Sequence, residues 1–111
     1  TESTRHMINS DAIAKMKQGV FIINTSRGPL IDEEALIKGL EAGKIGGAAL
    51  DVFENEPLAA DSRLHTFTNV VTTPHVAWRS DEAARDLVAE ASQNIIDFFD
   101  GKSLKNQLNL K

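Results

Sequence analysis

Three short apolar runs, each followed at once by a polar loop, constrain the fold of this chain more than any other feature. The runs are Val20–Asn24, Ile45–Val52 and Val70–Thr73. A helical pattern that begins after Asp32 separates the first run from the second. Strand, loop, helix and strand in this order form a βαβ unit, so we expect an α/β fold with parallel strands.

The first run is continuously apolar as far as Asn24 and is too short for a buried helix. Such runs are typical of strands that are covered on both faces of a parallel sheet, so we expect this strand to be fully buried. In the second run, Gly46 and Gly47 predict close packing against neighbouring backbone. The stretch 53–69 is expected to be a loop with one helical turn near Ser62–Phe67.

Capping residues predict where the helices begin and end. Asn9 or Ser10 can cap a short helix over Asp11–Lys17, which we expect Gly19 to end.

The next helix follows Asp32, a good N-cap residue, and Gly43 stands at its expected C′ position. The longest helix is predicted from Ser80 to about Asp100, where apolar residues recur at steps of three and four. Its predicted apolar stripe is Ala84, Leu87, Val88, Ala91, Ile95, Phe98 and Phe99. The polar tail carries three leucines that we expect to dock on a surface: Leu104, Leu108 and Leu110.

Length and composition narrow the class of protein. The chain has 111 residues, the size of one domain at most, and its net charge of −4 argues against a nucleic-acid partner or an anionic membrane. No apolar stretch is long enough to span a bilayer, and no secretory signal peptide is recognisable. The absence of cysteine excludes disulfides and fits a cytoplasmic protein. Because the chain begins at Thr1 without methionine, we expect a fragment of a longer protein, with ordinary N-terminal processing as the alternative.

Polar side chains with complementary chemistry follow the three runs. Arg27 follows the first run, Asp51 and Glu56 follow the core of the second, and His75 follows the third. The carboxyl ends of parallel strands meet at one edge of a sheet, so we expect these side chains to converge on one cavity. Histidine suits proton transfer near neutral pH, and a neighbouring carboxylate raises its pKa and fixes its tautomer.

Together these groups suit the interconversion of a 2-keto acid and a 2-hydroxy acid. In this hypothesis Arg27 grips the acid in two places, His75 gives or takes the hydroxyl proton, and Glu56 tunes the histidine. The hydride requires a cofactor, because no side chain carries one. A Gly-rich loop of the GxGxxG type is absent from the sequence, so the cofactor is inferred from the missing hydride source.

Each of these residues also has a plainer interpretation. Arg27 precedes Gly-Pro, where surface-turn arginines are common, and His75 follows proline in what can be an ordinary loop. Asp51 can cap a turn. His6 and His65 lie in polar stretches, and we expect structural or surface roles for them. No two histidines have the spacing of metal ligands, so no metal site is expected.

Three ordered motifs carry a family resemblance. Asn24–Gly28, Asp51–Pro57 and Thr73–His75, taken together, resemble the NAD-binding domain of the D-isomer-specific 2-hydroxyacid dehydrogenases. The resemblance covers essentially all of residues 1–111. It implies the second half of a Rossmann-like doubly wound parallel sheet, three strands with flanking helices, that ends in a long C-terminal helix. The run His75–Trp78 is most similar to the glycerate dehydrogenase (hydroxypyruvate reductase) branch.

The resemblance also implies roles for particular residues. Arg27 matches the substrate-binding arginine, His75 the catalytic acid and base, and Glu56 the glutamate that partners the histidine. Asp51 matches the aspartate that meets the nicotinamide carboxamide. The positions expected to contact the cofactor are Thr4, Thr25, Ser26, Arg27, Asp51, His75 and Ala77, and no metal ligand is implied.

The implied protein is an NAD- or NADP-dependent oxidoreductase that acts on a small 2-keto or D-2-hydroxy acid, with residues 1–111 as a partial NAD(P)-binding domain. We expect a cytoplasmic homodimer with no nucleic-acid or membrane partner, and an isolated fragment that binds NAD feebly and turns nothing over. The alternative is a non-catalytic, NAD-sensing domain of the co-repressor type, which shares the three motifs. A bare edge on the strand Val20–Asn24 would invite pairing with another chain.

Overall fold

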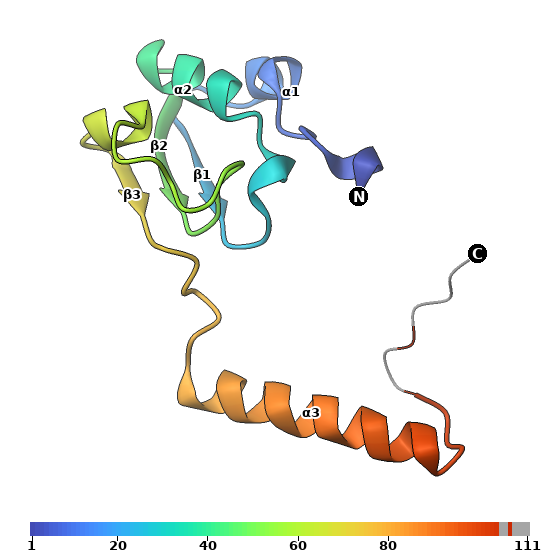
Figure 1. Cartoon of the computed structure of the whole chain (residues 1–111). Helices are drawn as coiled ribbons and strands as arrows, with labels where there is room; N and C mark the ends of the chain where they lie inside the picture. The colour runs from blue at the N-terminus through green and yellow to red at the C-terminus, as the bar shows by residue number, and fades with distance from the viewer. Residues whose placement is uncertain (105–106, 108–111) are drawn as a thin grey trace. The chain divides into compact units, whose positions relative to one another are not determined.

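A three-stranded parallel sheet forms the centre of the first of two compact units, residues 1–77. The computed structural model describes residues 1–104 and 107. Strands β1 (Val20–Asn24), β2 (Ile45–Leu50) and β3 (Val70–Thr72) pair in the order β1-β2-β3, and both pairings are parallel. All three arrows point the same way in Figure 1, which confirms the predicted α/β fold with parallel strands.

The register of the sheet brings the three strand ends level with one another. Asn24 of β1 is paired with Leu50 of β2, and Leu50 is paired with Thr72 of β3. The three polar loops therefore leave the sheet from one row of residues. This alignment positions the candidate site.

Two helices begin at side-chain caps, as predicted. Asn9 accepts a hydrogen bond from the backbone N–H of Ala12 at 3.0 Å and caps α1 (Ser10–Lys15). Asp32 accepts a bond from Ala35 N–H at 3.0 Å and caps α2 (Glu33–Glu41). Short 3-10 turns cover Glu2–Thr4, Gly28–Leu30 and Arg63–Thr66, of which the last was expected.

The predicted end of the first helix is wrong by two residues. The helix stops at Lys15, and Met16 is already extended. Gly19 instead makes the turn into β1, with a φ of +74° and a hydrogen bond from its N–H to Lys44 O at 3.0 Å. A glycine signals left-handed backbone, but its position does not fix how many residues before it the helix frays. Gly43, with a φ of +65°, follows α2 as expected.

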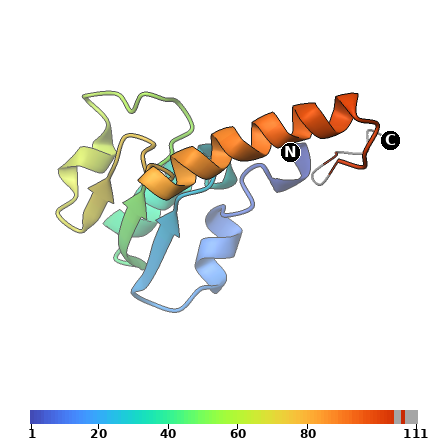
Figure 2. The same cartoon turned by 90° about the horizontal axis from the view of Figure 1, so that it is seen from below.

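The core lies between one face of the sheet and the two helices. Leu36, Ile37 and Leu40 of α2 are all buried. They belong to one apolar cluster with residues from all parts of the unit, among them Ile13, Ile22, Ile45, Ala48, Leu50 and Leu64. The strands lie side by side in both views (Figures 1 and 2).

Strand β1 is not fully buried, which corrects the sequence-based expectation. Ile22 and Asn24 are 9% and 6% exposed, but Phe21 and Ile23 are 72% and 74% exposed. Successive side chains of a strand point to opposite faces, and the core packs on the face that carries Ile22. The side chains of β1 are therefore alternately buried and exposed, although its sequence is continuously apolar as far as Asn24.

Close backbone packing at the two strand glycines is confirmed. A Cβ on Gly46 would lie 2.5 Å from the carbonyl oxygen of Gly19, and one on Gly47 would lie 2.7 Å from that of Asn69. Both positions of β2 therefore exclude any side chain.

The second unit contains the long predicted helix, α3 (Asp81–Phe99). Ser80 accepts a bond from Ala83 N–H at 3.1 Å at its start, and Gly101 follows its end with a φ of +68°. The apolar stripe of α3 is exposed, including Leu87 and Phe99. Leu104 is half-buried, whereas Leu108 and Leu110 lie outside the described residues. None of the helices in the described part of the chain is long and apolar enough to cross a membrane.

The two neighbours on β1 provide a matched test of the fold. Ile22→Ala is expected to reduce the free energy of unfolding by about 2–4 kcal/mol, because it removes buried methylenes and leaves a cavity. Ile23→Ala, the same change one residue along, is expected to cost less than about 1 kcal/mol. Urea unfolding of the 111-residue chain measures both, and equal losses would contradict the observed orientation of the strand.

Candidate active site

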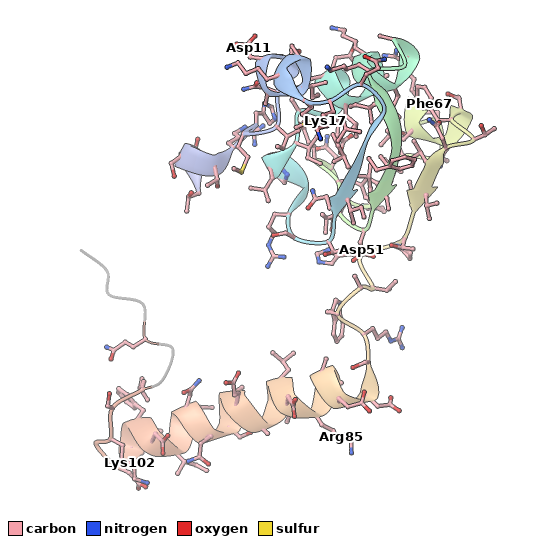
Figure 3. All side chains as sticks on the ribbon, turned by 180° about the vertical axis from the view of Figure 1, so that it is seen from behind. Asp11, Lys17, Asp51, Phe67, Arg85 and Lys102 are labelled. Atoms are coloured by element: carbon pink, nitrogen blue, oxygen red, sulfur yellow. The ribbon has the colours of Figure 1, made fainter. Side chains whose placement is uncertain are left out.

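The candidate site is built on the loops that leave the level ends of the three strands. The first loop contains Thr25–Gly28, the second runs from Asp51 to Pro57, and the third contains Thr73–Ala77. Figure 3 labels Asp51 at this end of the sheet.

Glu56 and His75 form a direct pair. The Nδ1 atom of His75 lies 2.8 Å from Glu56 Oε2, and the other carboxylate oxygen accepts a bond from Phe53 N–H at 3.0 Å. With Nδ1 held by a carboxylate, Nδ1 carries a proton and Nε2 is the nitrogen that can exchange one with a ligand. Both side chains remain partly exposed, so a ligand can reach them.

The surroundings of Glu56 hold the pKa of its carboxyl below the ordinary value. The bond with His75 is the largest cause, the Phe53 N–H bond is the second, and the positive charge of Arg27 also contributes. The charge of Arg27 is the smallest of these influences on Glu56. The pair is favoured in the form with an ionised carboxylate.

Asp51 organises the third loop from within. Its side chain is 3% exposed and accepts three bonds: from Thr73 Oγ1 at 2.5 Å, Val76 N–H at 2.8 Å and Ala77 N–H at 2.9 Å. Burial is the largest influence and opposes ionisation, but these bonds together outweigh it and lower the pKa of Asp51. A carboxylate has about four acceptor positions, so about one remains for the contact with a carboxamide that the family resemblance implies.

His75 adopts left-handed backbone as a result of this arrangement. Its φ is +55°, and its N–H donates to the backbone oxygen of Asp51 at 2.9 Å. Such a conformation is uncommon for a residue with a side chain and is often found at functional sites. Asp51 therefore fixes where the imidazole leaves the chain.

Asn24 is a site residue that sequence reasoning missed. It is 6% exposed, its Nδ2 donates to Arg27 O at 3.0 Å, and its Oδ1 accepts from Ser26 N–H at 3.1 Å. The amide thus closes the loop that carries Arg27. An asparagine at the end of an apolar run, just before a turn, is the sequence signal that could have revealed it.

Gly28 joins the first loop to the second. A Cβ at this position would lie 1.8 Å from Phe53 O and 2.7 Å from Glu54 N, distances that no real side chain can adopt. The glycine allows the backbone after Arg27 to lie against the backbone that precedes Glu56.

Arg27 and the Glu56–His75 pair line separate hollows, which corrects the expectation of one shared cavity. Glu56 and His75 line a hollow of about 500 Å³. His65, for which a structural or surface role was predicted, lines it too. Arg27 lines a second hollow of about 460 Å³. Its Nη1 donates to the adjacent Ser26 O at 2.7 Å, so the guanidinium folds back along its own loop.

The second hollow brings together several positions expected to contact a cofactor. Thr4, Ser26 and Arg27 line it along with Arg5. Thr25, which precedes Ser26 and directly follows β1, is exposed. Hydroxyl groups and guanidinium groups suit the phosphates and sugar hydroxyls of a dinucleotide, so these residues fit part of NAD or NADP. Among the described residues, no group of three or more His, Asp or Glu side chains could hold a metal ion.

Comparison with known proteins identifies the type of domain. Residues 1–77 match the family described as "D-isomer specific 2-hydroxyacid dehydrogenase, NAD binding domain". The chain is 46% identical to glyoxylate/hydroxypyruvate reductase B of Klebsiella pneumoniae, over 98% of this chain and 34% of that protein. It spans about a third of the length of the curated relatives it matches.

Solved structures show the same fold. A D-isomer specific 2-hydroxyacid dehydrogenase from Xanthobacter autotrophicus, in complex with NADPH and MES, superposes with a TM-score of 0.88 and 38% identity, over 98% of this chain and 44% of that one. D-lactate dehydrogenase with NAD+ from Lactobacillus jensenii gives a TM-score of 0.84 and 29% identity, over 99% of this chain and 37% of that one.

Gly28→Ala is expected to destabilise the chain by about 3 kcal/mol or more, because the new methyl group must displace backbone. Gly43→Ala serves as the matched control: it has open space but a positive φ, and is expected to cost about 1–2 kcal/mol. Urea unfolding measures both variants. A smaller loss at position 28 than at position 43 would contradict the close approach of the two loops.

Glu56→Gln tests the lowered pKa through the pH dependence of stability. A carboxyl whose pKa falls on folding stabilises the folded chain above the pKa of the unfolded state. That contribution is lost as the pH falls through the lower, folded pKa. We therefore expect the stability advantage of the wild-type chain over Glu56→Gln to be full at neutral pH and to shrink on acidification. Urea unfolding over a pH series measures it, and an advantage that grows toward acid would contradict the assignment.

Proposed function

The chain belongs to the D-isomer specific 2-hydroxyacid dehydrogenase family through its NAD binding domain, and on this premise we propose that the protein interconverts a small 2-keto acid and a D-2-hydroxy acid with NADH or NADPH. The contact of His75 Nδ1 with Glu56 at 2.8 Å, at the carboxyl end of a parallel sheet, carries the proposal. In this proposal residues 1–111 form part of a Rossmann-like NAD(P)-binding domain of a longer, two-domain enzyme.

His75 serves as the general acid and base. Glu56 holds Nδ1, so Nε2 donates its proton to the oxygen of the keto group during reduction and takes it back during oxidation. The ionised carboxylate of Glu56 stabilises the imidazolium form that precedes proton donation. The bound nicotinamide cofactor supplies or accepts the hydride.

Arg27 binds the carboxylate of the substrate. Only one of its donor groups is bonded to its own loop, at Ser26 O, and the other donors of the planar guanidinium can grip two carboxylate oxygens. Thr4, Thr25, Ser26, Asp51 and Ala77 are the remaining positions that we assign to cofactor contacts.

The names of the relatives support the substrate class. They include reductases of glyoxylate, hydroxypyruvate and aromatic 2-oxoacids, which share a carboxylate next to a carbonyl group. We assign the same class to this protein, and further propose a cytoplasmic homodimer without a nucleic-acid or membrane partner, in keeping with the acidic net charge of −4.

Steady-state reduction of glyoxylate, hydroxypyruvate and pyruvate by the intact protein, followed by NADH and NADPH absorbance, tests the proposal. His75→Gln is expected to lower kcat/KM by about 10²- to 10⁴-fold, because proton transfer by a positioned group is lost. Lys38→Ala, an exposed change on α2, is the control. Binding of NADH without reduction of any 2-keto acid would overturn the proposal in favour of the non-catalytic, NAD-sensing alternative.

A further inference from the structure

A second contact between a histidine and a carboxylate lies outside the Glu56–His75 pair. The Nε2 atom of His6 lies 2.6 Å from Glu54 Oε1. The imidazole is half-exposed, but its Nε2 atom is shielded from solvent. Nε2 forms no aligned hydrogen bond within the described residues, and the carboxylate of Glu54 is its polar neighbour. Lone pairs of a bare nitrogen and a carboxylate would repel at this distance, so the contact is favourable only when Nε2 carries a proton.

Glu54 is also interlocked with the start of α2. Its N–H donates to Glu33 Oε1 at 2.5 Å, while Glu33 N–H donates to Glu54 Oε1 at 3.4 Å. Burial raises the pKa of Glu33, and the negative charge of Glu54 raises it further. The bond from Glu54 N–H lowers this pKa but does not cancel the rise. Nε2 of His6 therefore lies against a carboxylate whose residue is itself bonded to a second acidic residue, Glu33.

The backbone of His6 binds a different loop. Its N–H donates to Pro29 O at 2.8 Å, and its φ of +51° is the left-handed conformation that turns the side chain toward Glu54. One residue thus connects the turn that contains Thr4, the loop that follows Arg27 and the loop that leads to Glu56. These three segments line the two hollows of the candidate site.

We propose that His6 is a positioning residue for the catalytic pair: by holding Glu54, it fixes the loop that presents Glu56 to His75. The proposal rests on the proposed function for its kinetic consequence only. It assigns His6 no contact with substrate or cofactor. Its effect passes through the backbone of Asn55, the one residue that separates Glu54 from Glu56.

Kinetics of the intact protein provide the first test. His6→Ala is expected to lower kcat about tenfold or more, with the KM for NADH within about twofold, as for other residues that orient catalytic groups. His6→Gln places an amide nitrogen where Nε2 stands and is expected to restore kcat to within about threefold. His6→Asn is the matched control for this rescue, since its shorter amide reaches only the position of Nδ1, and it is expected to behave like His6→Ala.

Arg63→Ala controls for simple loss of stability. It breaks contacts of Arg63, which lines neither hollow, with Glu34 and Glu41 on α2, and is expected to leave kcat unchanged. A kcat for His6→Ala equal to that of the wild type, a His6→Gln variant as slow as His6→Ala, or an equal loss of kcat in Arg63→Ala would each overturn the proposal.

Carbon-13 NMR titration of the Glu56 carboxyl in the 111-residue chain provides a test that requires no turnover. The low pKa of Glu56 depends on its bonds with His75 and Phe53 N–H, so a loosened loop should release it. We expect the pKa of Glu56 to rise by about half a unit or more in His6→Ala and to stay unchanged in Arg63→Ala. An unchanged pKa in His6→Ala overturns the positioning role. Absence of reduction by the wild-type protein overturns only the proposed function.

Discussion

The backbone contact between Gly28 and the Phe53–Glu54 peptide is the constraint on which the site depends. It brings the loop after β1 to within van der Waals distance of the loop after β2, with no side chain between them. Level strand ends make this approach possible, because Asn24, Leu50 and Thr72 stand in one row of the sheet. Because the two loops touch, the positive charge of Arg27 contributes to the lowered pKa of Glu56. The two side chains nevertheless line different hollows.

The carboxylates at this edge divide structural and chemical work between them. Asp51 is almost completely buried, gives three acceptor positions to its own chain, and sets the turn that carries His75. Glu56 gives one oxygen to its own backbone and the other to the imidazole. Glu54 faces His6 and the start of α2. Each hydrogen bond that a carboxylate accepts from its own chain leaves one acceptor position fewer for a ligand. Asp51 accepts three such bonds, and Glu56 accepts one and contacts His75 with its other oxygen.

Sequence patterns predicted what local chemistry determines. The bounds of β1, the caps at Asp32 and Ser80 and the neighbouring positions of Glu56 and His75 follow from short-range rules and from parallel strand order. The burial of β1 was not predictable, because an unbroken apolar run does not reveal that only the face with Ile22 meets the helices. The direction of the Arg27 side chain was missed for another reason: an exposed arginine has many rotamers, and the bond to Ser26 O selects one of them.

The two bonds of the Asn24 amide have a consequence for chemical ageing of the protein. One end of this amide accepts from Ser26 and the other donates to Arg27 O, so the two ends are not interchangeable. Spontaneous hydrolysis of the amide to a carboxylate would set an anionic oxygen against the carbonyl of Arg27 inside a buried site, where such a repulsion is costly. A single deamidation event, without any change in the genetic sequence, would thus loosen the loop that holds the arginine.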